Sequence, residues 1–243
     1  MQTSLPQSRR LRDYTSIPFE IFIVAFSLLP FLVLAYFYPA LPERVPLLLN
    51  LSGEVETWAE KSLLSVFRVP LIAVVMQVVC LLMKYGVVQY QAATPPNVEI
   101  GRTTLVEQSL NLNAALWDWL RCSIAFKMIA ESLDTIFLSL DRFKFLSRPA
   151  FIISIIATAV GVAGALIYGY RLLAVTQDMK RKFANTKVAA PVDARQVYGG
   201  VLYVNPSDST LFAGRYVLNF GNKWAWVFVA CIIAYPLLAF WPA

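Results

Sequence analysis

Long apolar stretches alternate with polar ones along this chain, and four of the apolar stretches predict membrane-spanning helices. Pro18–Tyr38 carries a single charge, Glu20, at its edge, and Val66–Tyr85 consists mainly of Val, Ile, Leu and Met. Pro149–Tyr170 contains no charge, and Trp224–Trp241 has tryptophan at both ends, as in an interfacial aromatic belt. A helix needs about 20 apolar residues to cross the hydrocarbon core of a bilayer, so each stretch is close to the required length.

A fifth stretch, Leu110–Leu140, predicts a helix that is apolar but interrupted by five charged residues. Lys127, Glu131 and Asp134 follow i, i+4, i+7 spacing and therefore share one face. A charge near the centre of a lipid-facing helix costs roughly 2.5–3.5 kcal/mol, whereas an apolar residue returns only about 0.3–0.6 kcal/mol. The helix therefore cannot face lipid on all sides. Either its charges face the interior of a bundle, or it lies flat at the interface with its charges in water.

The distribution of Lys and Arg favours a crossing by this fifth helix. If it crosses, the N-terminus, the 84–114 loop and the 171–223 segment share one side and hold 13 of the 21 Lys and Arg, against 6 on the other side. If it does not cross, the split is 10 against 11. Because cytoplasmic loops carry the excess of Lys and Arg, we predict five spans with a cytoplasmic N-terminus.

Composition agrees with a membrane protein and argues against an enzyme. The 243 residues are 58% hydrophobic and 15% charged, with a mean hydropathy of +0.59, which is too apolar for an ordinary soluble domain. The chain has no histidine, so it lacks the commonest general base and transition-metal ligand, and its three cysteines form no C-x-x-C pair. We therefore predict no catalytic residues, no metal site and no cofactor. The net charge of +6 fits cytoplasmic loops beside lipid, and we expect no nucleic-acid partner.

The predicted fold class is an all-α membrane protein with about five transmembrane helices and a small cytoplasmic segment that contains a β-hairpin. The hairpin is expected because Val201–Val204 and Tyr216–Phe220 alternate in the manner of short strands. In order, we predict a cytoplasmic tail over 1–17, a membrane domain over 18–172 with helices near 18–38, 66–86, 113–140 and 149–171 and an ordered loop over 39–65, a basic cytoplasmic segment over 173–222 with the hairpin, and a last transmembrane helix over 223–243. Small residues recur every fourth position in the 149–171 helix and predict a close helix contact. They are Ala157, Gly161, Ala165 and Gly169.

The first loop carries a sequence pattern that resembles a known family. Three prolines in eight residues, followed by Asn50 and Gly53, predict an ordered, turn-rich loop. The pattern Leu-Pro-x-Arg-Val-Pro, then Asn, then Gly-Glu-Val-acid-x-Trp resembles a domain of unknown function shared with SdpI-type immunity proteins, which protect Gram-positive cells from a secreted toxin. The matching positions are Leu41, Pro42, Arg44, Pro46, Asn50, Gly53, Val55 and Trp58, with Glu56 where the family has aspartate. Leu48 and Leu49 stand where the family carries His-Phe.

A second resemblance lies near the C-terminus. A Tyr-x-Asn-Pro-x-Asp core that contains Asn205 and Asp208, a basic residue at Arg215 and the Leu-Asn-Phe sequence from Leu218 to Phe220 are similar to another small uncharacterised domain found in the same bacterial membrane proteins. The order of the two motifs along the chain also matches that family.

The resemblance implies a non-enzymatic protein of the bacterial inner membrane that recognises a protein or peptide partner, as in immunity or signalling. Candidate residues for contacting a partner or structuring the loops are Arg44, Asn50, Gly53, Glu56, Trp58, Asn205, Asp208 and Arg215. Three alternatives stay open. The motifs can be purely architectural, the protein can be an accessory subunit that docks through its small-residue face, or it can be a small transporter or ion pathway centred on Lys127, Glu131 and Asp134.

Overall fold

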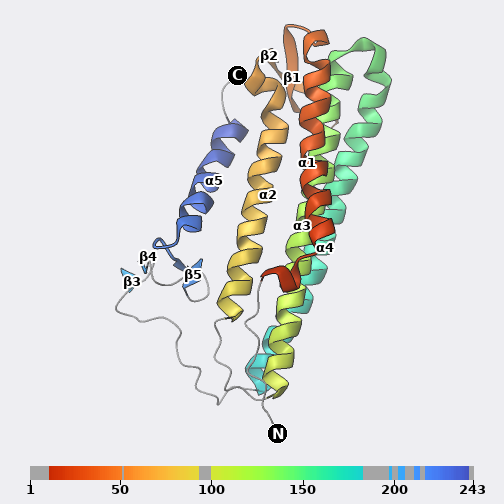
Figure 1. Ribbon diagram of the computed structural model, residues 1–243. Coiled ribbons are helices and arrows are strands. Elements are labelled where there is room, and N and C mark those ends of the chain that lie inside the picture. Colours follow the sequence, from red (N-terminus) through yellow and green to blue (C-terminus); the bar gives the residue numbers. More distant parts are fainter. Residues whose placement is uncertain are drawn as a thin grey trace. The chain divides into compact units, whose positions relative to one another are not determined.

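Five long helices dominate the computed structural model, which describes residues 11–50, 52–92, 100–182, 197–198, 202–205, 211–213 and 217–240 (Figure 1). They are α1 (Ile17–Phe37), α2 (Leu63–Ala92), α3 (Ile100–Ser139), α4 (Ser147–Lys182) and α5 (Lys223–Phe240). All five predicted helices are present. Helices α2, α3 and α4 extend past the predicted limits because hydropathy marks the edge of an apolar stretch, whereas good helix formers such as Leu, Gln, Lys and Arg continue the helix beyond it.

Three of these helical segments are long and apolar enough to cross a membrane. They cover Ile17–Ala40, Leu63–Val88 and Asp141–Met179, and Lys223–Ala239 is a shorter apolar helix. The charged α3 does not meet this criterion of length and composition. A membrane protein is thus supported, while the number of crossings stays a prediction.

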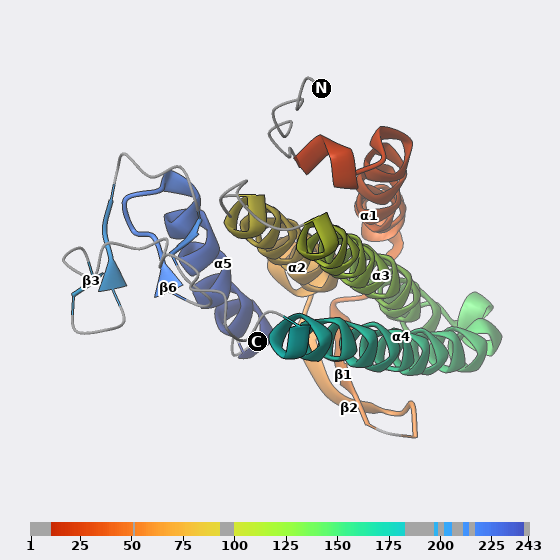
Figure 2. The same ribbon diagram turned by 90° about the horizontal axis from the view of Figure 1, so that it is seen from below.

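The contacts divide the chain into two compact units. One unit comprises Met1–Ile17, Val79–Asp118 and Ala165–Ala230, and the other, which we call the hairpin unit, comprises Pro18–Val78, Trp119–Gly164 and Cys231–Ala243. In the hairpin unit, α3 lies between α1, α2 and α4 and contacts each of them (Figure 2). The charged helix is therefore packed against three more apolar ones.

A β-hairpin follows α1 (Figure 1), and a buried apolar cluster fixes it to the helices. Strand β1 (Arg44–Leu49) pairs antiparallel with β2 (Val55–Glu60), with a bulge near Leu47. The cluster joins residues of α1, the hairpin, α2 and α3, and its fully buried members are Leu34, Leu41, Val45, Val66 and Ile136. The predicted ordered loop is thus a sheet. Strand β2 gave only a weak signal in the sequence, because Trp58 lies between Glu56 and Glu60 on its outward side and breaks the alternation of apolar and polar residues.

Most of the charged residues on α3 form ion pairs. The guanidinium of Arg121, which is 2% exposed, donates to both carboxylate oxygens of Glu20 at 2.7 Å and to the side-chain oxygen of Gln77 at 3.0 Å. In the other unit, buried Lys84 bonds both oxygens of Asp118 at 2.8 Å. Of the two arrangements considered for this helix, these contacts match the one with charges facing the bundle interior.

The small-residue face of α4 packs partly against α3. A Cβ added at Gly161 would lie 2.8 Å from the Cβ of Ser123, and one added at Gly164 would overlap the indole of Trp119. The indole N–H also donates to the carbonyl of Val160 at 3.2 Å. By contrast, nothing lies within 4 Å of a Cβ at Gly169. The predicted periodicity therefore included Gly161 but missed Gly164, the tighter contact.

The C-terminal segment contains two short hairpins where one was predicted. Strand β3 (Val197–Tyr198) pairs with β4 (Leu202–Tyr203), and β5 (Phe212–Ala213) pairs with β6 (Val217–Leu218). The two segments predicted to form one hairpin are thus each paired with a closer neighbour, which closes a shorter and entropically cheaper loop. Fully buried Asn219 joins the hairpins, because its side-chain oxygen accepts from the backbone N–H of Asn205 at 3.1 Å and its amide donates back to the carbonyl of Asn205.

Gly164 and Gly169 provide a matched test of the α3–α4 contact. Replacing Gly by Ala in a helix interior gains about 0.8–1 kcal/mol of helix propensity, so Gly169→Ala should raise the thermal unfolding midpoint. Gly164→Ala should lower it, since overpacking against Trp119 costs about 1–3 kcal/mol. Circular dichroism of the detergent-purified protein measures both. Equal shifts for the two variants would contradict the packing described here.

The Glu20–Arg121 pair can be tested by a double-mutant cycle. Glu20→Gln should destabilise the protein by about 1.5–3 kcal/mol, because it leaves a buried guanidinium without its charged acceptor. Adding Arg121→Met should recover part of that loss, which gives a coupling energy above about 0.5 kcal/mol. Unfolding in a denaturing detergent supplies the free energies, and Glu43→Gln at an exposed position is the control. Additive effects would show that the pair does not stabilise the bundle.

Candidate functional site

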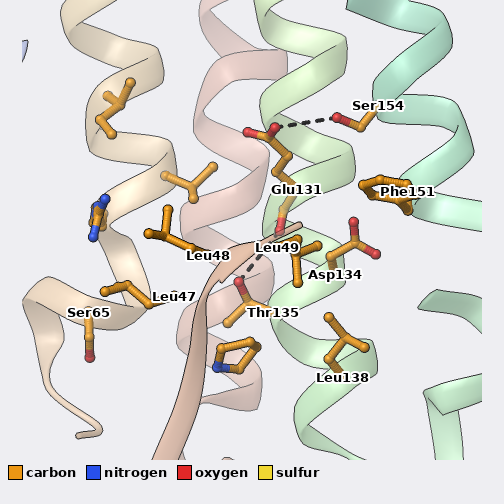
Figure 3. A pocket seen from close by; sticks show the side chains of 14 residues that line it. Leu47, Leu48, Leu49, Ser65, Glu131, Asp134, Thr135, Leu138, Phe151 and Ser154 are labelled. Atoms are coloured by element: carbon orange, nitrogen blue, oxygen red, sulfur yellow. Dashed lines mark hydrogen bonds between the residues drawn. The ribbon is translucent and has the colours of Figure 1, made fainter. Parts of the chain in front are cut away.

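A cavity of about 270 Å³ lies in the hairpin unit, beside strand β1 and between α2, α3 and α4 (Figure 3). Strand β1 contributes Pro46 and the leucines that follow it, while α2 contributes Arg68 and apolar residues. Glu131 and Asp134 line it from α3, and Phe151 from α4. The cavity thus combines apolar walls with a few charged groups, which is the usual composition of a ligand pocket.

The two carboxylates of the cavity differ in their partners. Glu131 forms an ion pair with Lys127 one turn earlier and accepts a hydrogen bond from the hydroxyl of Ser154 at 3.4 Å. Asp134 is 2% exposed, and neither of its carboxylate oxygens has a hydrogen-bond partner among the described residues. In the predicted stripe, Lys127 and Glu131 therefore form an ion pair, while Asp134 is a buried acid without a described partner.

Arg68 carries the positive charge on the α2 wall. It is 8% exposed, and its guanidinium donates to the backbone carbonyl of Ala239 in α5. Two hydroxyls of the cavity are directed to the main chain, since Thr135 donates to the carbonyl of Glu131 at 3.5 Å and Ser65 to that of Glu60 at 2.8 Å. Few polar groups of the cavity are therefore left to satisfy Asp134.

The motif residues Asn50 and Gly53 build the turn of the hairpin. The side-chain oxygen of Asn50 accepts from the backbone N–H of Ser52 at 3.0 Å and of Glu54 at 2.9 Å. Gly53 has a φ of +83°, which disfavours any residue with a Cβ, and a Cβ there would lie 2.9 Å from the ring of Phe151. Because Phe151 also lines the cavity, the turn is packed against the wall of the site.

The outward side of β2 forms a surface that we call the acidic face. It consists of Glu54, Glu56, Trp58 and Glu60, all of them exposed, while Ala59 on the opposite side is buried. Trp58 is 48% exposed and lies directly across from Pro46 of β1. Arg44 lies across from Glu60 and offsets one of the three negative charges.

The remaining predicted residues lie away from the cavity. Asn205 belongs to the C-terminal hairpins, where its side chain also donates to the hydroxyl of Tyr203 at 3.0 Å, so its contacts are architectural. Asp208 and Arg215 lie outside the described residues. Prediction from the sequence missed Arg68, Phe151 and Ser154. Only Arg68 carried a signal, as a lone charge inside an apolar stretch.

Comparison with known protein families gives a match, and it includes the hairpin. Residues 25–74 match the family described as Domain of unknown function (DUF1648). The match runs from α1 through both strands into α2, so it includes the hairpin, its turn and the Arg68 wall of the cavity. It supports the predicted similarity to an uncharacterised domain family, and the closer relation to immunity proteins stays a prediction. No curated protein and no solved structure matches the chain.

Asp134 should limit the stability of this protein. A buried polar group without a partner costs about 1–3 kcal/mol, so Asp134→Leu should raise the thermal unfolding midpoint by several degrees. Asp141→Leu makes the same change at an exposed position just after α3 and should shift the midpoint little. A midpoint that falls in Asp134→Leu would show that the carboxylate already has a stabilising partner.

Proposed function

We propose that this protein is a non-enzymatic component of the bacterial inner membrane that recognises a basic peptide on its β1–β2 hairpin. The acidic face carries the proposal. Two exposed carboxylates and one half-exposed tryptophan lie on β2, and a third exposed carboxylate, Glu54, directly precedes it, in a protein whose overall charge is +6. Carboxylates attract a basic peptide over a distance, and an exposed indole holds a cation by cation–π attraction worth about 0.5–1 kcal/mol at such sites.

The hairpin is preorganised for binding. Its turn is fixed by Asn50, and its base is fixed by Lys61, whose ammonium donates to the carbonyl of Leu41 at 2.8 Å and lies 5.0 Å from the ring centre of Tyr38. A rigid surface loses little entropy when a partner binds. Within the part of the chain that the structure describes, β2 pairs only with β1. Its other edge is therefore open to an extended peptide.

The membrane topology that fits this function has α3 crossing the bilayer. Ile136 near the end of α3 packs with Val66 at the start of α2 and Leu34 near the end of α1. The second half of α3 therefore runs back along α2 toward the hairpin. With a cytoplasmic N-terminus, as loop charge predicts, the hairpin lies outside the cytoplasm, where a secreted peptide would first reach the cell.

The other hypotheses receive less support. For an ion pathway, the stripe on α3 offers one uncompensated group, Asp134, because Glu131 is paired with Lys127. A relay normally uses several such groups in series. For an accessory subunit, the docking face on α4 is in part already covered by α3 at Gly161 and Gly164.

Photocrosslinking tests the proposed recognition. Benzoylphenylalanine in place of Trp58 should capture a discrete basic peptide in membranes of the native host, whereas the same group at exposed Leu32 of α1 should not. The captured peptide is identified by mass spectrometry, synthesised and titrated against the purified protein. Glu56→Gln with Glu60→Gln should weaken its binding at least about tenfold, and rising salt should weaken wild-type binding.

Glu43→Gln, an exposed acid outside the acidic face, is the matched control and should leave the affinity unchanged. A captured partner that is neutral or acidic, or an affinity insensitive to the double substitution, would refute recognition by charge.

A further inference from the structure

We propose that the cavity beside β1 binds one alkylammonium or guanidinium group, with the carboxylate of Asp134 as its counter-ion. The first reason is that the carboxylate of Asp134 is buried without hydrogen-bond donors in the part of the chain that the structure describes. Both of its oxygens are buried and lack hydrogen-bond partners among the described residues, and its side chain lines the cavity next to Phe151 (Figure 3). An ionised carboxylate at this position lacks donors, and a neutral one lacks an acceptor for its O–H.

Neither the basic residue that lines the cavity, Arg68, nor Lys127, which pairs with a lining acid, bonds to Asp134. Lys127 pairs with Glu131, and Arg68 on the opposite wall donates to the carbonyl of Ala239. Among the charged groups that line the cavity, two are acids on α3 and one is a base on α2. A bound cation is therefore drawn to the α3 wall, toward Asp134 and Glu131, and is repelled from the Arg68 end.

The size and lining of the cavity define the class of cation. A volume of about 270 Å³ lies just below the range of roughly 300–1,000 Å³ for pockets that enclose drug-sized ligands, so one side-chain-sized group fits. Val69, Ile72 and Leu138 supply apolar contact for an alkyl stem, and the ring of Phe151 lines the cavity beside Asp134.

A metal ion fits the cavity less well than an organic cation. Hard cations such as Mg²⁺ and Ca²⁺ take six or more oxygen ligands, whereas the hydroxyls of Ser65 and Thr135 already bond to main-chain carbonyls. An ammonium needs at most three acceptors, and a guanidinium is matched by the two oxygens of one carboxylate.

The natural source of the cation is a Lys or Arg side chain or the N-terminus of a peptide held by the hairpin. This identification rests on the proposed function, whereas the site itself does not. Pro46 joins the two surfaces, because it lines the cavity and lies directly across from Trp58 of the acidic face. A peptide lying along β2 could thus insert one basic group beside β1.

Binding of n-butylammonium and n-butylguanidinium to the full-length protein in lipid nanodiscs tests the site. Saturation-transfer NMR of the butyl protons and the shift of the thermal unfolding midpoint both report binding. Wild-type protein should bind both probes saturably, n-butanol at least tenfold more weakly, and sodium chloride at equal ionic strength should produce no saturable shift. Asp134→Asn should lower the affinity for both probes at least tenfold, while Asp141→Asn, the same change at an exposed position, should not.

A second variant keeps the test independent of any effect of Asp134 on folding. Ile72→Phe fills the cavity, leaves the carboxylate in place and should also abolish binding. The proposal is overturned if Asp134→Asn binds the probes as tightly as wild-type protein, if butanol matches butylammonium, or if Ile72→Phe has no effect.

Results that disprove the cation site can be distinguished from results that disprove peptide recognition. Glu56→Gln with Glu60→Gln should leave butylammonium binding unchanged, because both residues lie outside the cavity. The peptide acetyl-Leu-Lys-Leu-amide, compared with its norleucine analogue, shows whether a lysine side chain reaches the site. Selective binding of the lysine peptide supports a peptide source. Binding of butylammonium alone supports the site with a free amine as its ligand and counts against peptide recognition.

Discussion

Helix α3 carries seven charged residues and can lie among apolar helices only if those charges find partners, and the rest of this bundle is arranged around that requirement. Arg121 of α3 reaches Glu20 on α1 and Gln77 on α2. Both α1 and α2 are long and apolar enough to cross a membrane. These contacts hold α3 against its neighbours, because a buried charge is stable only when it is paired.

The hairpin depends on the same helix. The end of α3 supplies Ile136 to the cluster that holds Val45 of β1, and the turn at Gly53 rests on Phe151 of α4. One charge on α3 departs from the pattern of pairing, since Asp134 is buried beside the cavity without a described partner. A buried acid without a partner destabilises the folded state, and such a group is typical of a binding site that is retained at the expense of stability.

Much of this architecture could be predicted from the sequence, but its pairings could not. Hydropathy located all five helices, and the prolines with Asn50 and Gly53 indicated an ordered loop. Periodicity also placed Lys127, Glu131 and Asp134 on one face. It could not show that Asp134 lacks a described partner, because that depends on which residues the other helices bring near. The partners Arg121 and Glu20 are 101 residues apart. The four-residue repeat on α4 likewise missed Gly164, because which glycine meets Trp119 is set by the relation of two helices.

The central claim is that α3 returns through the membrane to the side of the hairpin, with its charges paired inside the bundle. Single cysteines at Ser52 in the hairpin turn and at Lys144 just after α3 test this most directly, in a background where Cys80, Cys122 and Cys231 are replaced. Both should react with a membrane-impermeant maleimide from the same side of the membrane, because Phe143 packs against the cluster at the base of the hairpin. Labelling of the two cysteines from opposite sides would contradict the account.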